Sequence, residues 1–104
     1  MEVGIKEGAD IRGIRPELVL AYTIILYIYT KYDDGDVQCV ITEGTGGKHG
    51  VGSLHYVGQA IDLRIWGLTE SEKRTLLADI TKSLSKQFDV ILESDHIHVE
   101  FQPK

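Results

Sequence analysis

With 104 residues, the chain is long enough to form a single domain with a sizeable hydrophobic core. Apolar residues make up 42% of it and charged residues 26%, which is the balance of a folded protein and excludes a disordered one. The net charge of −5 argues against nucleic acid as a partner, because phosphate binding requires a basic surface. We therefore expect one monomeric globular domain over residues 1–104.

The N-terminal segment and the longest apolar run bear on where the protein is made. Residues 1–13 are acidic and contain several glycines, whereas a secretory signal begins basic and continues apolar. Residues 18–29 form the longest apolar run, about a dozen residues, whereas a bilayer span requires about 20. We therefore expect a protein that is cytoplasmic as synthesised, with no signal peptide and no membrane partner.

The first predicted element is a helix. It is expected to begin near Pro16, which suits the first helical turn, and to end near Tyr32, before a turn over residues 33–36. Apolar side chains surround nearly the whole of this helix, which indicates packing against a sheet. A strand is predicted over residues 37–42, and its cysteine, Cys39, is expected to be a buried thiol.

The second half of the chain is predicted to contain one helix and three strands. A glycine-rich loop over residues 44–52 leads to a strand over residues 59–65. Thr69 and Glu72 have the spacing of a capping box and open the helix. The apolar face of that helix is predicted to contain Leu76, Leu77, Ile80, Leu84 and Phe88. Two short strands complete the set, at residues 90–93 and 97–101. This order, without a repeated βαβ unit, predicts an α+β domain with a mainly antiparallel sheet.

Two of the predicted strands each have one apolar and one polar face. Successive side chains of a strand point to opposite sides of the sheet. The apolar faces are predicted to contain Ile61, Leu63, Ile65, Ile97, Val99 and Phe101. The polar faces are predicted to contain Asp62, Arg64, His96, His98 and Glu100. If both strands belong to one sheet, the helices cover its apolar face, and the opposite face displays a carboxylate with two imidazoles.

This combination of side chains is typical of a zinc site. Zinc binds imidazole nitrogen and carboxylate oxygen, and a catalytic site uses three protein ligands and a water. His55 precedes the strand that contains Asp62, and Gly58 lets the backbone turn so that this histidine folds back over the strand. His55, Asp62 and His98 are therefore the candidate ligands of one Zn2+ per chain. The alternative is an ordinary strand exterior with solvated histidines.

Two motifs resemble those of a known family. Residues 53–62 read SLHYVGQAID, which resembles the S-x-H-x-x-G-x-A-x-D motif of LAS-type zinc peptidases, the D-Ala-D-Ala carboxypeptidases and L-alanyl-D-glutamate endopeptidases. Residues 95–101 read DHIHVEF, which resembles the family's second motif, an acidic residue followed three positions later by the last ligand and then x-E-F. The resemblance implies zinc ligands at His55, Asp62 and His98, with the zinc site on the sheet face opposite the helices.

The resemblance also implies an activity. It implies a zinc metallopeptidase that hydrolyses a short peptidoglycan stem peptide, as a carboxypeptidase or an endopeptidase, by means of a metal-activated water. Such enzymes include bacterial wall enzymes and phage endolysins, so we expect a phage-encoded enzyme that acts on the cell wall after release. The alternative is a zinc-containing binding or virion-associated module on the same fold without catalysis.

The general base has two candidates. Asp95 lies three residues before His98, where the family has its base. The same segments are also similar to the hedgehog signalling domain, and that likeness implies that His49 and Glu93 line the site. The base is therefore Asp95 or Glu93, and the spacing favours Asp95.

Further polar residues have two interpretations each. His96 can stabilise the transition-state oxyanion or simply support the site. Ser53 can orient substrate or close the turn before His55. Arg64 can bind a peptide carboxylate or form a surface ion pair with Glu100, and we expect the ion pair. Lys48 can also bind a peptide carboxylate.

Two aromatic residues and the absence of one arginine bear on how substrate could be bound. Tyr56 and Trp66 are expected to be packing residues. The wall peptidases usually have an arginine that holds the substrate in an upstream segment, but the matching residues 42–45 contain none. The sequence therefore leaves the identity of the substrate open.

Overall fold

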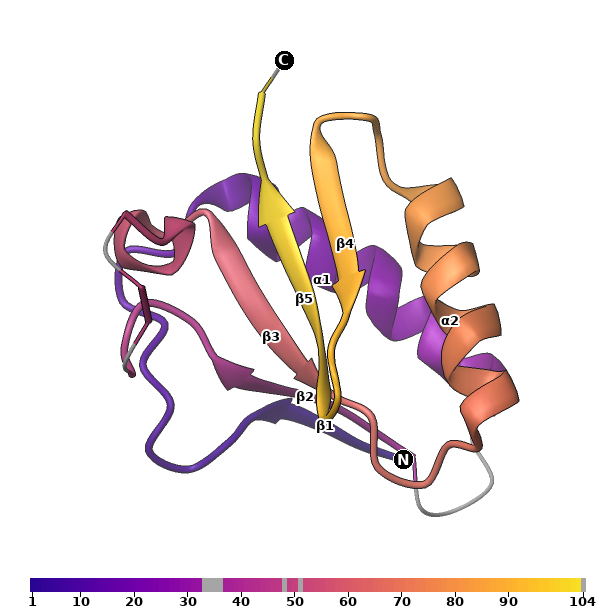
Figure 1. Ribbon diagram of the computed structural model, residues 1–104. Helices are drawn as coiled ribbons and strands as arrows, with labels where there is room; N and C mark the ends of the chain where they lie inside the picture. Colours follow the sequence, from indigo (N-terminus) through magenta and orange to yellow (C-terminus); the bar gives the residue numbers. More distant parts are fainter. Residues whose placement is uncertain (33–36, 48, 51, 104) are drawn as a thin grey trace.

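The computed structural model describes residues 1–32, 37–47, 49–50 and 52–103 (Figure 1). The predicted turn at residues 33–36 and Lys48 lie outside the described residues. The elements in chain order are β1 (Glu2–Ile5), α1 (Pro16–Tyr29), the 3-10 helix η1 (Thr30–Tyr32), β2 (Gln38–Glu43), the 3-10 helix η2 (Leu54–Val57), β3 (Ala60–Arg64), α2 (Glu70–Ser83), β4 (Phe88–Leu92) and β5 (His96–Phe101). They form an α+β domain with two helices and a five-stranded mixed sheet of order β1-β2-β3-β5-β4.

The first strand was not predicted. Residues 2–5 pair with β2 in parallel, so β1, α1 and β2 form a single βαβ unit, and the other three strand pairings are antiparallel. The sheet is therefore mainly antiparallel, as predicted, with one parallel pairing at its β1 edge. Val3 and Ile5 alternate with Glu2 and Gly4, but the strand has only four residues and both apolar side chains stay about half exposed, so the pattern is too short to indicate a strand.

The ends of the helices explain where the predictions were right and wrong. α1 begins at Pro16 as predicted, and its last turn tightens into η1, which ends at Tyr32. The capping box of α2 is present, since Thr69 Oγ1 accepts from Glu72 N–H and Glu72 Oε1 accepts from Thr69 N–H. The assignment of Phe88 to this helix was wrong. The backbone is already extended at the C-cap, and Phe88 instead begins β4, with its ring 5.1 Å from that of Phe101.

Both helices pack against one face of the sheet and form a single core with it. Their buried residues meet the alternate residues of β2, β3 and β5 (Figure 1). The core residues are Leu18, Ala21, Ile25, Ile28, Tyr29, Val37, Cys39, Ile41, Ile61, Leu63, Ile65, Leu68, Leu76, Ile80, Leu84, Ile97, Val99 and Phe101. The predicted apolar faces of the two central strands are therefore confirmed. Cys39 is buried, as predicted, and burial raises the pKa of its thiol to about 12.

α1 is apolar on more than the side that packs. Leu18, Ile25 and Ile28 lie in the core, whereas Leu20 and Tyr27 are largely exposed. Packing of this helix against a sheet is confirmed, but its outer face is not covered by the described part of the chain. Within that part, no helix combines the length and the apolar character needed to cross a membrane.

Gly58 connects η2 to the segment that precedes α1. Its φ of 76° is left-handed, and a Cβ added there would lie 2.0 Å from the carbonyl oxygen of Gly13. The adjacent backbone is tied as well, because Arg15 N–H donates to Gly58 O at 3.0 Å. Only glycine permits both this conformation and this approach.

Gly58→Ala should therefore destabilise the fold more than a comparable substitution without the close approach. Gly8 provides the control, since its φ of 88° is also positive but no atom lies within 4 Å of an added Cβ. Gly8→Ala should cost about 1–2 kcal/mol for the left-handed backbone. Gly58→Ala should cost a further ~1–3 kcal/mol for the steric conflict. Urea unfolding of both variants measures the difference, and equal costs would show that the Gly13 carbonyl moves away freely.

Candidate metal centre

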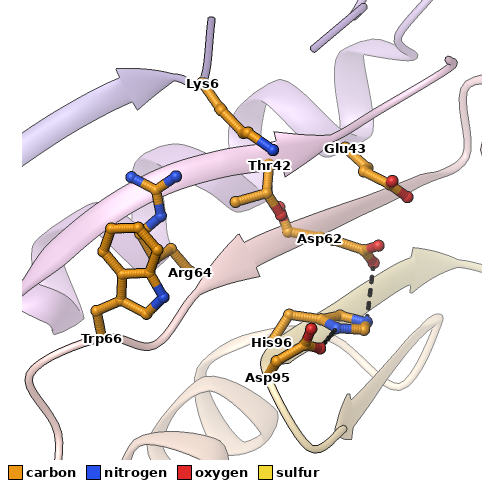
Figure 2. Close-up of a pocket in the computed structure, with 8 residues that line it drawn as sticks. All are labelled: Lys6, Thr42, Glu43, Asp62, Arg64, Trp66, Asp95 and His96. Carbon is orange, nitrogen blue, oxygen red and sulfur yellow. Dashed lines mark hydrogen bonds and ion pairs between the residues drawn. The ribbon is translucent and has the colours of Figure 1, made fainter. Parts of the chain in front are cut away.

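The register of the two central strands brings Asp62 and His98 together. β3 and β5 are antiparallel, and Asp62 lies directly opposite His98. The two side chains meet on the sheet face away from the helices, with His98 Nδ1 2.9 Å from Asp62 Oδ1. Asp62 is only 6% exposed, yet it also lines an open cavity of about 320 Å³ (Figure 2). The predicted shared polar face of these strands is confirmed for this pair.

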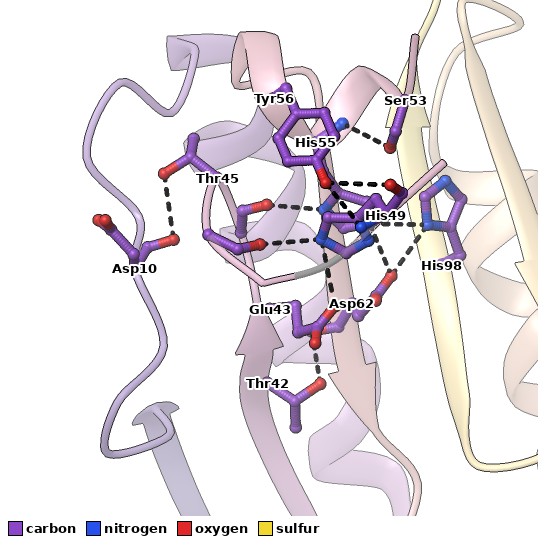
Figure 3. Close-up of polar contacts among 12 residues, drawn as sticks. Asp10, Thr42, Glu43, Thr45, His49, Ser53, His55, Tyr56, Asp62 and His98 are labelled. Carbon is purple, nitrogen blue, oxygen red and sulfur yellow. Dashed lines mark hydrogen bonds and ion pairs between the residues drawn. The ribbon is translucent and has the colours of Figure 1, made fainter. Parts of the chain in front are cut away.

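His55 reaches the same point from η2 (Figure 3). Ser53 caps this 3-10 helix, and its Oγ accepts from His55 N–H at 3.2 Å. Gly58 then ends η2 and directs the chain into β3. As a result, the buried His55 ring lies over β3, with Nε2 3.2 Å from Asp62 Oδ1 and 3.2 Å from His98 Nδ1.

The three ligand atoms form a triangle of the size that a tetrahedral ion requires. Its edges are 2.9, 3.2 and 3.2 Å. Bonds of about 2.0–2.2 Å to a tetrahedral zinc ion separate the ligand atoms by roughly 3.3–3.6 Å. The observed edges are a few tenths of an ångström shorter, so a small outward movement of each side chain accommodates an ion. His55, Asp62 and His98 are the group of potential metal ligands found in the described part of the chain.

The far nitrogen of each imidazole determines which nitrogen can bind a metal. His55 Nδ1 lies 2.7 Å from Gly44 O, and a carbonyl only accepts, so this nitrogen carries the proton. His98 Nε2 lies 2.8 Å from Glu100 Oε1, an acceptor when ionised. In their neutral forms both rings therefore turn a lone pair towards Asp62. Carbonyl and carboxylate partners of this kind orient the histidine ligands of metal sites.

Two lone pairs and a carboxylate that face one another repel unless a positive charge lies among them. Burial alone would raise the pKa of the Asp62 carboxyl, but hydrogen bonds with His55 and His98 outweigh it and hold the pKa well below its usual range. The hydrogen bond with Asp62 raises the pKa of the His98 imidazole against the opposing effect of burial, and Glu100 adds to the rise. A proton on His98 can supply this charge, and so can a divalent cation.

His49 covers the centre without joining the triangle (Figure 3). Its ring stacks on that of His55, with centroids 3.9 Å apart and planes at 7°. Its Nε2 is 2.9 Å from Gly46 O and 3.2 Å from Glu43 Oε2, and its backbone is held by the hydroxyl of Tyr56. His49 therefore lies against the candidate metal centre through the ring of His55.

Asp95 and His96, at the start of β5, form a pair that also lines the cavity (Figure 2). Asp95 Oδ1 accepts from His96 Nδ1–H at 2.6 Å, which leaves His96 Nε2 3.6 Å from Asp62 Oδ1. Glu93 is exposed in the turn between β4 and β5 and is absent from the residues that line this cavity. Of the two candidate bases, only Asp95 therefore lies beside the candidate metal centre.

The expected ion pair between Arg64 and Glu100 is not formed. In the antiparallel register Arg64 lies opposite His96, whereas Glu100 lies opposite Ala60 and bonds to His98 instead. The guanidinium of Arg64 stacks 3.9 Å above the ring of Trp66. The packing role expected for Trp66 was also wrong, since 59% of the residue is exposed.

Three contributions to the site were not predicted from sequence. Glu100 orients His98, and its position two residues away on the same strand face was a usable signal. The Gly44 carbonyl orients His55, and a β-bulge at the end of β2 precedes it, but a backbone contact leaves no trace in composition. Lys6 lines the cavity from the segment after β1, and no motif marks it.

No family model matches the chain, and no curated protein matches it either. What the site can do therefore follows from its own geometry and from the two motifs in its sequence.

Without metal, the free energy of unfolding should fall as the pH rises through the raised pKa of His98. The protonated ring gains partners only in the folded state, so its contribution is complete below its ordinary pKa of 6.5 and is lost above the raised one. Urea unfolding in the presence of a chelator, between about pH 5.5 and 9, measures the slope. His98→Gln should abolish the slope and His49→Gln should retain it. A slope that persists in His98→Gln would assign the effect to another group.

Proposed function

We propose that the chain is a zinc-dependent peptidase that hydrolyses a short peptide of the peptidoglycan stem type. The observation that carries the proposal is the convergence of His55 Nε2, Asp62 Oδ1 and His98 Nδ1 on one point, with the far side of each imidazole held by an acceptor. Such an arrangement is expected of metal ligands and is costly for groups that bind nothing.

The donor set favours zinc over other ions. Two imidazole nitrogens and one carboxylate oxygen, without cysteine, match the three-ligand sites of catalytic zinc, which leave one position open for water. Calcium and magnesium prefer oxygen ligands throughout. Asp62 belongs to the ligand triangle and also lines the cavity, so a bound ion would have a space beside it for water and substrate. Zinc held there by His55, Asp62 and His98 would polarise a carbonyl and lower the pKa of a bound water towards neutrality.

The pair of Asp95 and His96 provides proton transfer in this proposal. His96 holds Asp95 Oδ1, which leaves the second carboxylate oxygen to accept a proton from the attacking water. The Asp95 side chain is 83% exposed, so it can then pass that proton to the leaving amine. His96 Nε2 lies near Asp62, and when a proton occupies both ring nitrogens it can donate to the oxygen that becomes negative in the transition state.

The class of substrate is supported by the cavity and by the motifs. A space of about 320 Å³ suits a few residues of peptide. The likeness of residues 53–62 and 95–101 to the LAS-type motifs supports a stem peptide of the cell wall. We keep both a carboxypeptidase and an endopeptidase within this proposal.

The purified protein should contain about one zinc ion per chain, measured by atomic emission. His55→Ala should weaken zinc binding by more than about 100-fold, because it removes one of three protein ligands. His96→Ala is the matched control, since it removes a neighbouring imidazole outside the triangle, and it should retain the metal. Wild-type protein that binds no zinc would refute the proposal.

Incubation with stem peptides, followed by mass spectrometry, should identify a cleaved bond. Asp95→Asn should lower kcat by about 100-fold to 10,000-fold with an unchanged zinc content, because it removes the base. Glu93→Gln, the matched control in the same turn, should have little effect. Loss of activity in Glu93→Gln alone would transfer the role of base to Glu93. Full zinc occupancy without any product would identify a binding module instead of an enzyme.

A further inference from the structure

Two cations lie in the cavity beside the metal centre (Figure 2). Asp62 and His96 line one end of this space, whereas Lys6 and Arg64 line the other (Figure 2). The cavity therefore has one end that suits a metal ion and one end that suits an anion.

Arg64 is held in place for binding. Its guanidinium lies 3.9 Å above the Trp66 ring, and one N–H donates to Gln38 Oε1 at 2.7 Å. A cation–π contact and a single hydrogen bond orient the group without neutralising it. A guanidinium has five N–H donors, so most of them remain for a ligand.

Lys6 comes from a different part of the chain. Its backbone N–H donates to Ile41 O at 2.9 Å, which anchors it beside β2, while its side chain is exposed. Within the described residues, neither Lys6 nor Arg64 forms an ion pair, although the chain has 16 acidic and 11 basic residues. The carboxylates that line the same cavity are those of Glu43, Asp62 and Asp95. No ion pair in the described part of the chain neutralises either cation, so both remain available to bind an anion.

We propose that Lys6 and Arg64 bind a carboxylate of the peptide whose scissile carbonyl lies at the metal centre; this rests on the proposed function above. The planar fork of Arg64 matches a carboxylate with two parallel hydrogen bonds, and Lys6 adds a point charge. Asp62 and Arg64 are two residues apart on β3, about 7 Å along the strand. About two residues of extended peptide cover that distance, so the carboxylate lies within about two residues of the cleaved bond.

Trp66 makes this binding measurable without turnover. It is the single tryptophan of the chain and lies against Arg64, so its fluorescence reports on this end of the cavity. The zinc-loaded protein should bind N-acetyl-D-alanine at least about 10-fold more tightly than N-acetyl-D-alaninamide, because only the acid provides a charge-assisted hydrogen bond. Equal affinities for the acid and the amide would overturn the proposal.

Matched variants assign the preference to the two cations. Arg64→Gln and Lys6→Gln should each reduce the preference for the acid by about 10-fold. The controls are Arg74→Gln and Lys82→Gln, which remove the same charges from the exposed face of α2, and they should leave the preference unchanged. If Arg64→Gln binds like Arg74→Gln, the carboxylate is held elsewhere, including at the zinc ion, and the proposal fails.

Peptide hydrolysis identifies the source of the carboxylate. A stem pentapeptide has one carboxylate at its C-terminus and one on its D-glutamyl residue. Amidation of the carboxylate that binds should lower kcat/KM of the wild type by about 10-fold or more, and amidation of the other should not. Loss on C-terminal amidation identifies a carboxypeptidase, and loss on D-glutamyl amidation identifies an endopeptidase. If the wild type cleaves both amidated peptides as well as the parent, the anion site is wrong and the peptidase stands.

The two proposals fail in different ways. If the wild type cleaves no stem peptide but its Trp66 fluorescence still shows an acid preference that Arg64→Gln removes, the peptidase is refuted and the carboxylate site stands. In that case the protein binds carboxylates beside a metal ion without hydrolysing the peptide.

Discussion

A carboxylate that is removed from water requires positive charge or hydrogen-bond donors around it, because burial of an uncompensated charge costs several kcal/mol. Asp62 is such a group, with 6% exposure in the centre of the sheet. His98 reaches it from the paired strand, and His55 reaches it from η2, which in turn depends on the Ser53 cap and the Gly58 turn. The local structure around this sheet face thus brings compensating groups to a single buried carboxylate, which a bound metal ion would also compensate.

The geometry of β3 also sets the distance between the two ends of the cavity. β3 contributes both the candidate metal ligand Asp62 and Arg64, two residues apart on one face, so the separation between the proposed metal and anion sites is set by strand geometry and not by a loop. The helices on the other face make this sheet rigid, because its apolar side is packed throughout. Binding groups on such a support keep their spacing when substrate arrives.

The predictions from sequence were most accurate where a periodic pattern was sufficient. Alternation placed Asp62 and His98 on one polar face, and the capping box located the start of α2. The register between β3 and β5 could not be predicted from either strand alone. In the observed register Arg64 and Glu100 are not opposite each other, which is why the expected ion pair was wrong. The backbone of Gly44 and the side chain of Lys6 join the site only through tertiary structure, since neither carries a local pattern.

The order of the strands has a consequence for how the domain would acquire the proposed metal ion. β3 and β5 are neighbours at the centre of the sheet, but α2 and β4 lie between them in the chain. Pairs of such high sequence separation close late, since loop entropy must be overcome before contacts form. The triangle of ligands cannot exist before this closure. An ion bound by these ligands would therefore arrive at a nearly complete domain and slow its unfolding, rather than nucleate its folding.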